Sequence, residues 1–386
     1  MPFNAFRDVR PVGCRWNDAW HGFDAMQKPL NDNNRRMTET CPAMTASPEN
    51  ILLFYASVSG HDEYINERYR ELIGKADTDR LVTEAVRLEV AGGLAGRLSD
   101  AGCDRDGVVG RLREAAVREM RATASMKALA ASVMRILSET GIDYMPLKGC
   151  DPRISGEARG FFNVMHDIDI LVKLRDLDEA ARALESGGFR CAGPHSPSHT
   201  AFLSNDDVPR LIEIHWDLVN RTNPVHSRLF RVNIEKIWDR SIKMCSLSLL
   251  SPVDLLSYLS AHGLKEYFHK PKWLADLAWA VLNLSGEAHE EDARGIVAEW
   301  GAGCALGIAA AALNDMLPCG RFDAAFDIGA VRPGLLGRFC AGRLVDYGSL
   351  RKLRPLLLLA SAGTPSEKLA VAAGIAAKAA RLVTGN

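Results

Sequence analysis

The sequence lacks any long hydrophobic run, and this absence argues against a helical membrane protein. No apolar stretch approaches the roughly 18 to 20 residues with which a helix spans a bilayer. The first residues, MPFNAFRDVRPVGCRW, contain no continuous apolar core, so no secretory signal is predicted either. We therefore expect no membrane span.

The chain also lacks a charge excess and a paired-cysteine motif. The 47 basic and 48 acidic residues leave a formal net charge of −1, so no global field would attract an anionic surface, and we do not expect nucleic acid as a partner. The nine cysteines are odd in number and form no CxxC motif, which favours free thiols over a disulfide framework or a zinc ribbon. These features predict a cytoplasmic protein and leave its oligomeric state open.

The pattern of the sequence divides the chain into four parts. Residues 1–46 are polar and aperiodic, which predicts a disordered or loosely ordered segment, and Met37 or Met44 is then a candidate for the real start. Residues 47–140 have helical periodicity, 141–245 predict an α/β core, and 246–386 predict a further helical region.

Local signals mark the individual elements. Ser47 and Pro48 suit the N-cap and first position of a helix. Apolar residues recur at roughly helical spacing from Val109 to Leu137, and Gly141 then ends a long helix. The stretches IDYMPLKG, DIDILVK and PRLIEIHWDL predict three strands, and DLDEAARALESGGF predicts a helix between the last two.

Two aspartates inside the second strand need a physical reason. Side chains two residues apart share one face of a strand, so Asp167 and Asp169 lie together, opposite the isoleucines. The same alternation in the third strand puts Glu213, His215 and Asp217 on one face. Like charges this close repel each other, whereas a divalent cation between them holds both ionised.

Three carboxylates on neighbouring strands therefore predict a site for a hard cation. The ligands would be Asp167, Asp169 and Glu213, and the ion Mg²⁺ or Mn²⁺, because oxygen donors suit both. These three residues are also the candidate catalytic residues.

A turn before the acidic strand carries groups that suit a phosphate. Gly149 lets backbone N–H groups approach an anion, and Lys148 can neutralise it. Arg153 and Arg159 in the following loop are further candidates for phosphate contact, as is His215 on the face of the third strand.

Together these residues resemble the polymerase-β-type nucleotidyltransferase superfamily, which uses a Gly-containing turn, a DxD strand and a third acidic strand. The closest likeness is to the bacterial family of uncharacterised nucleotidyltransferases. Its members show LLKG, a D-I-D-L-L-V strand and an E-[IL]-H-W strand, followed by a helix with spaced histidines and W-x-x-D-L. This chain has PLKG, HDIDILV, IEIHWDL and LSYLSAHGLKEYFHKPKWLADLAWAV, so the likeness covers roughly residues 80–285.

The resemblance implies an α+β fold, with a small mixed-sheet core flanked by N-terminal helices and a C-terminal helical bundle. It also implies Mg²⁺-dependent transfer of a nucleoside monophosphate from an NTP such as ATP to an unknown acceptor, which is a small molecule, a sugar or a protein side chain. In that mechanism Asp167 and Asp169 hold metal around the triphosphate, and Glu213 binds metal near the acceptor. The cleft is expected where the sheet faces the C-terminal helices.

The chain departs from its relatives in three places, and two alternatives stay open. Asn163 stands where relatives carry Arg, His166 where they carry Gly, and Cys150 where the superfamily commonly has Ser. One alternative is a degenerate protein that binds a nucleotide or a partner without turnover. The other is a hydrolase whose softer metal, Mn²⁺ or Zn²⁺, is held by the three carboxylates with His166 and His215.

Overall fold

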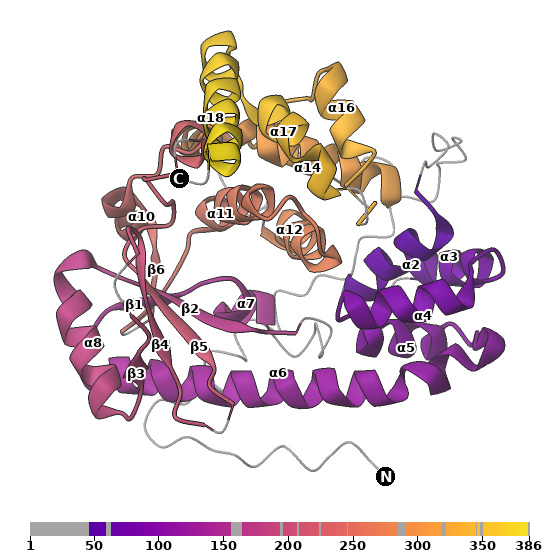
Figure 1. The fold of residues 1–386 in the computed structure, drawn as a ribbon, viewed down its shortest axis with the longest axis horizontal. Helices are drawn as coiled ribbons and strands as arrows, with labels where there is room; N and C mark the ends of the chain where they lie inside the picture. Colours follow the sequence, from indigo (N-terminus) through magenta and orange to yellow (C-terminus); the bar gives the residue numbers. More distant parts are fainter. Residues whose placement is uncertain are drawn as a thin grey trace. The chain divides into compact units, whose positions relative to one another are not determined.

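A computed structural model describes most of the chain (Figure 1). The described residues are 46–58, 63–155, 164–193, 196–206, 208–223, 225–244, 246–284, 290–317, 322–344, 346–347 and 350–384. The segment predicted to be loosely ordered, 1–46, lies outside these residues except for Ala46, and so do Arg159 and Asn163.

Seven strands form one mixed sheet in the order β3-β4-β5-β2-β1-β7-β6. Their bounds are β1 Tyr144–Pro146, β2 Asp167–Val172, β3 Arg190–Cys191, β4 His199–Leu203, β5 Leu211–His215, β6 Ile242–Met244 and β7 Leu247–Leu249. The pairs β2–β5 and β1–β7 are parallel, and the other neighbours are antiparallel. The predicted mixed sheet is therefore confirmed.

The three predicted strands correspond to β1, β2 and β5. Strands β3, β4, β6 and β7 were not predicted, and β7 carries the sheet to Leu249, four residues past the predicted end of the core at 245. Strand β5 ends at His215, two residues before Asp217. The prediction that Asp217 shares the face of Glu213 is therefore wrong: its buried carboxylate instead accepts hydrogen bonds from Arg221 and the Val219 backbone.

Helices precede the sheet in the chain. They are α2 Pro48–Ser57, α3 Glu63–Ile73, α4 Thr78–Arg87, α5 Ala91–Asp100 and α6 Val108–Glu139. Ser47 caps α2 by accepting from the Asn50 N–H, and Gly141 follows α6 at φ +75°, as predicted from the sequence. One end of α6 packs on α4 and α5, and the other end packs on the sheet and on α8, Leu177–Ser186 (Figure 1).

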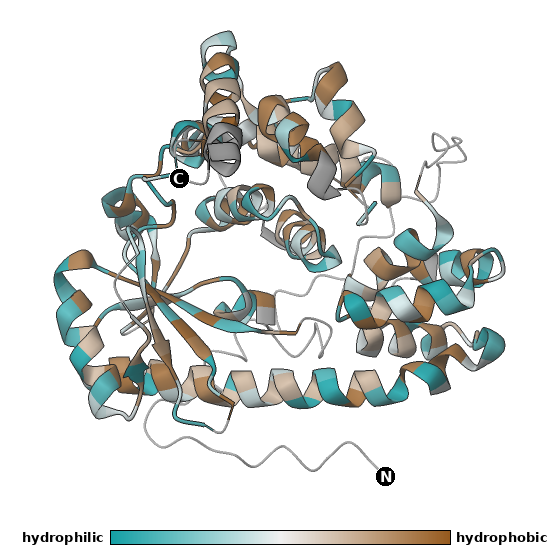
Figure 2. Cartoon of the chain, in the orientation of Figure 1, coloured by the Kyte–Doolittle hydropathy of each residue, from teal (hydrophilic) through white to brown (hydrophobic). Residues whose placement is uncertain are grey.

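The remaining helices lie mostly after the sheet. Four helices are short. Between strands lie α7 Pro152–Ser155, α9 His226–Leu229 and α10 Ile234–Arg240, and α15 Ala324–Asp327 comes after the sheet. The C-terminal group is α11 Pro252–Lys265, α12 Pro271–Leu284, α13 Glu290–Trp300, α14 Gly303–Met316, α16 Leu335–Ala341, α17 Leu350–Ser361 and α18 Pro365–Thr384. Hydrophobic and hydrophilic residues alternate along most of these helices, as expected where one side is buried (Figure 2).

Helix α11 is almost entirely buried and is held by charged and polar contacts at its start. Ser251 caps the helix, and the fully buried Asp254 accepts from Arg240 at 2.7 Å and from the Trp300 indole at 2.8 Å. These contacts fix α11 to α10 and α13, and so determine which side chains of α11 face the sheet.

Among the described residues, no single helix is long and apolar enough to cross a membrane. One sharply bent pair, Asp292–Trp300 with Gly303–Met316, has the required length and composition when its two halves are taken together.

Candidate active site

The structure brings the three predicted carboxylates together. Parallel pairing of β2 with β5 sets Asp169 directly beside Glu213, on the same face of the sheet. One oxygen each from Asp167, Asp169 and Glu213 lie within 4.8 Å of one another. The opposite face of both strands is apolar and fully buried, so the alternation of the sequence decides where the acids point.

Asp169 is the buried centre of this cluster, with 2% of its surface exposed. Its Oδ1 accepts from the Lys148 ammonium at 3.0 Å and from His215 Nε2 at 2.9 Å. Burial alone would raise the pKa of Asp169, but these two cationic partners hold it well below its usual range. The Lys148 ammonium and the His215 hydrogen bond therefore favour the ionised form of Asp169.

The other two carboxylates differ in their electrostatics. Burial and repulsion by Asp169 raise the pKa of Asp167 above its ordinary value. A hydrogen bond from His215, whose Nε2 lies 3.3 Å from the carboxylate, lowers the pKa of Glu213. Burial would lower the pKa of His215, but its hydrogen bonds to Asp169 and Glu213 raise it above the ordinary value.

The turn between β1 and α7 places Lys148 beside the acids. Lys148–Cys150 form a single 3₁₀ turn, in which Lys148 has left-handed backbone at φ +48°. At Gly149 a Cβ would meet Met165 Cγ at 3.1 Å, so the glycine leaves room for the segment that leads into β2. The strained backbone at Lys148 turns its side chain toward Asp169.

Cys150, which stands where relatives have Ser, is buried behind the same turn. Burial raises the pKa of its thiol, and the sulfur accepts a hydrogen bond from the Asp169 backbone. The buried side chain and its raised pKa favour the neutral thiol.

Two other predicted groups lie elsewhere. The Arg153 guanidinium is buried, forms a two-point ion pair with Asp151 at 2.6 and 3.0 Å, and donates to the Leu250 carbonyl. This arrangement does not fit a phosphate contact. His166 points to Glu89, at 2.7 Å, and so does not join the carboxylates as the hydrolase alternative required.

Sequence reasoning missed four residues around the cluster. His199 on β4 lies opposite His215, and Tyr258, His262 and Lys272 on α11 and α12 lie within electrostatic reach of the acids. His262 is buried, with no hydrogen-bond partner for Nε2 among the described residues, and burial with nearby lysines holds its pKa well below the ordinary value. The sequence pattern contains His262, but the side of α11 that faces the acids depends on how the helix packs.

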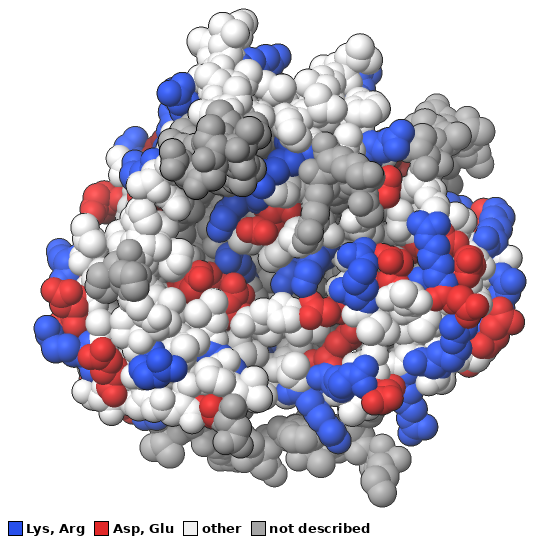
Figure 3. All heavy atoms as spheres, viewed as in Figure 1, with Lys and Arg blue, Asp and Glu red and all other residues white. Residues whose placement is uncertain are grey.

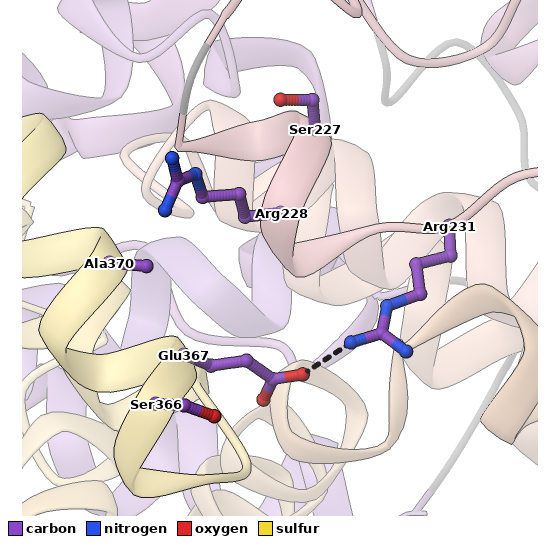
Figure 4. A pocket seen from close by; sticks show the side chains of 6 residues that line it. All are labelled: Ser227, Arg228, Arg231, Ser366, Glu367 and Ala370. Atoms are coloured by element: carbon purple, nitrogen blue, oxygen red, sulfur yellow. Dashed lines mark hydrogen bonds and ion pairs between the residues drawn. The ribbon is translucent and has the colours of Figure 1, made fainter.

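Charged side chains of both signs gather in a hollow on the face drawn in Figure 3, in the region where Figure 1 draws α11, α12 and β2. A separate open pocket of about 330 Å³ lies between α9 and α18 (Figure 4). In that pocket Arg231 pairs with Glu367 at 3.0 Å. It contains none of the carboxylates described above, and the chemistry of the donor groups identifies the sheet face as the better candidate.

The family comparison agrees with the geometry. A family model described as uncharacterised nucleotidyltransferase matches residues 74–318, which is more than half of the chain and includes every carboxylate of the cluster. No curated protein and no solved structure matches the chain.

Proposed function

Because this chain belongs to the family of uncharacterised nucleotidyltransferases, we propose that it transfers a nucleoside monophosphate from an NTP to an acceptor with the help of Mg²⁺ or Mn²⁺. The observation that carries this proposal is the convergence of Asp167, Asp169 and Glu213. Oxygen-only donors that repel one another in the absence of a cation are suited to a hard divalent ion.

The donor set fits such an ion on electrostatic grounds. Burial and the neighbouring Asp169 raise the pKa of Asp167 by more than Lys148 and Lys272 lower it, so a further cation beside this carboxylate would favour its ionised form. A divalent ion held by these carboxylates would neutralise and orient the triphosphate, which is most of what phosphoryl-group transfer requires.

Side chains of the protein itself can supply the remaining charge. Lys148 reaches the cluster from the turn after β1, and Lys272 approaches from α12, so the triphosphate would lie between the sheet and the C-terminal helices. A carboxylate with a lowered pKa is a weak base, so we assign Glu213 the part of a ligand before that of a proton acceptor.

We propose that the acceptor is a small molecule, a sugar or a protein side chain. Each of these can offer the hydroxyl or phosphate that the reaction needs. The alternative of a degenerate nucleotide-binding protein shares the same site and predicts binding without transfer.

Two assays test the proposal. In the first, Mg²⁺ with each NTP in turn should raise the melting temperature of the wild-type protein, but not that of Asp167→Asn. In the second, label should pass from α-phosphate-labelled NTP to an acceptor in cell extract. Loss of Asp167 should lower this transfer at least about 100-fold, because a charge-neutralising ligand is lost.

A matched control is available just outside β1 and β2. Asp143 forms an ion pair with Lys173 at 2.6 Å and takes no part in the cluster, so Asp143→Asn should keep both responses. Nucleotide binding without any label transfer would favour the degenerate alternative. A Mg²⁺ response in Asp167→Asn equal to that of wild type would refute the metal assignment.

A further inference from the structure

A second group of metal-binding side chains adjoins the carboxylate cluster. Antiparallel pairing of β4 with β5 places His199 directly opposite His215, with ring centroids 5.0 Å apart. The Nε2 atoms of both rings face Glu213: His199 lies 3.7 Å from Oε1 and His215 lies 3.3 Å from Oε2. One donor atom from each of the three residues falls within 4.8 Å of the others.

These separations suit a tetrahedral ion. With metal–nitrogen and metal–oxygen bonds of about 2.0 to 2.2 Å, adjacent donors in a tetrahedron lie roughly 3.3 to 3.6 Å apart. The distances to Glu213 are 3.7 Å from His199 Nε2 to Oε1 and 3.3 Å from His215 Nε2 to Oε2, so each imidazole lies near this separation from one carboxylate oxygen. To bind the ion, His215 would exchange its hydrogen bond to Asp169 for the metal. All three side chains are partly exposed, which leaves room for water or another ligand to complete the shell.

The His199 ring is also held from behind. The Ser196 hydroxyl lies 2.8 Å from Nδ1, and the Ser198 hydroxyl lies 3.3 Å from it. A hydroxyl can donate or accept, so it also supports the tautomer that leaves a lone pair on Nε2. Metal-binding histidines regularly have an outer partner of this kind.

We propose that His199, His215 and Glu213 form a second metal site that takes a transition-metal ion such as Zn²⁺ or Co²⁺. Two imidazoles with one carboxylate prefer these ions to Mg²⁺, whereas the neighbouring all-oxygen cluster has the opposite preference. Glu213 belongs to both groups, so an ion at the histidines withdraws a ligand from the carboxylates. Such an ion should therefore inhibit nucleotidyl transfer. This inhibition rests on the function proposed above, whereas binding of the transition metal does not.

Binding of Co²⁺ to the purified full-length protein tests the site directly. We expect about one equivalent of Co²⁺ with the visible absorption of a low-coordinate, nitrogen-ligated ion, and Zn²⁺ should displace it. His199→Gln should weaken this affinity by more than about 10-fold, because the loss of a ligand costs at least as much as the loss of an outer partner. His269→Gln is the matched control, since Nδ1 of that ring bonds the Glu266 carbonyl in its own turn and His269 belongs to neither group of candidate metal ligands among the described residues.

Asp167→Asn separates the two sites, because it removes an all-oxygen ligand and leaves the histidine group complete. It should keep Co²⁺ binding and lose the Mg²⁺ response. Unchanged Co²⁺ affinity and spectrum in a folded His199→Gln protein would overturn the inference, as would the absence of nitrogen-ligated Co²⁺ in wild type. If Co²⁺ binds as expected but no label is transferred in Mg²⁺, the proposed function fails and the metal site stands.

Discussion

Replacing Asp169 with Asn should destabilise the metal-free protein by about 3 kcal/mol. The Asp169 carboxylate lies 3.0 Å from the Lys148 ammonium, and at an effective dielectric constant of about 20 this pair attracts by about 5 kcal/mol. Removing one partner of a buried pair generally costs about 3 to 5 kcal/mol, because the other charge stays buried. We expect the lower value, since Asn still accepts one hydrogen bond and Asp167 remains near Lys148.

Replacing the neighbouring Asp167 with Asn should have the opposite effect and stabilise the metal-free protein. The pKa of Asp167 is raised by burial and by Asp169, so its ionised form opposes folding at neutral pH, and an amide removes that cost. Thermal melts in chelator-treated buffer should show Asp169→Asn lower by about 6 °C and Asp167→Asn no lower than wild type. Equal losses in the two variants would refute this account of the charges.

Three further predictions concern residues around the site. Burial raises the pKa of Glu89, but its bonds to His166 and Lys270 outweigh this and lower the pKa to about 2. The ionised Glu89 therefore stabilises the fold above about pH 4.5, and this stabilisation is lost as the pH falls from about 4.5 to 2. Glu89→Gln should therefore cost about 1 to 2 kcal/mol at pH 7 after allowance for solvent screening, and denaturant unfolding at pH 7 and pH 3 should show the cost shrinking in acid. Arg153→Met should cost about 3 kcal/mol in urea unfolding because it removes the guanidinium that pairs with the buried Asp151. The folded fraction should keep the nucleotide KM of wild type, and a raised KM would support the phosphate role. Cys150→Ser keeps a hydrogen-bond acceptor in the same place, so both stability, within about 1 kcal/mol, and label transfer should be retained.

Alternation along short strands made the site predictable in part. Asp169 and Glu213 each stand between two isoleucines, and Asp167 directly precedes one, so burial of the apolar face of these strands puts all three carboxylates on the other face. Helix caps were predictable for a similar reason, because Ser47 and Gly141 act on backbone groups within a few residues. In each case the decisive interaction is local or follows from burial of one face.

The remaining features depend on contacts between distant parts of the chain. His199 lies in a stretch with little hydrophobic signal, and it becomes a neighbour of His215 only because β4 pairs with β5. Arg153 looked free to meet a phosphate, and only the folded chain shows its donors taken by Asp151 and by the carbonyl of Leu250, 97 residues away. A single sequence contains no direct signal for such pairings.

The charges of the site explain how metal and nucleotide binding would depend on each other. In the structure, the Lys148 ammonium neutralises Asp169, and His215 donates a hydrogen bond to the same carboxylate. A divalent ion at the carboxylates would take over that task, and Lys148 would then be free to turn to a phosphate oxygen. Each ligand thus prepares the site for the other, and by linkage NTP should raise Mg²⁺ affinity by the same factor by which Mg²⁺ raises NTP affinity. Replacing Lys148 with Met should lower that factor without weakening Mg²⁺ binding in the absence of NTP, because it removes a cation that competes with Mg²⁺ and is the group that would contact the phosphate.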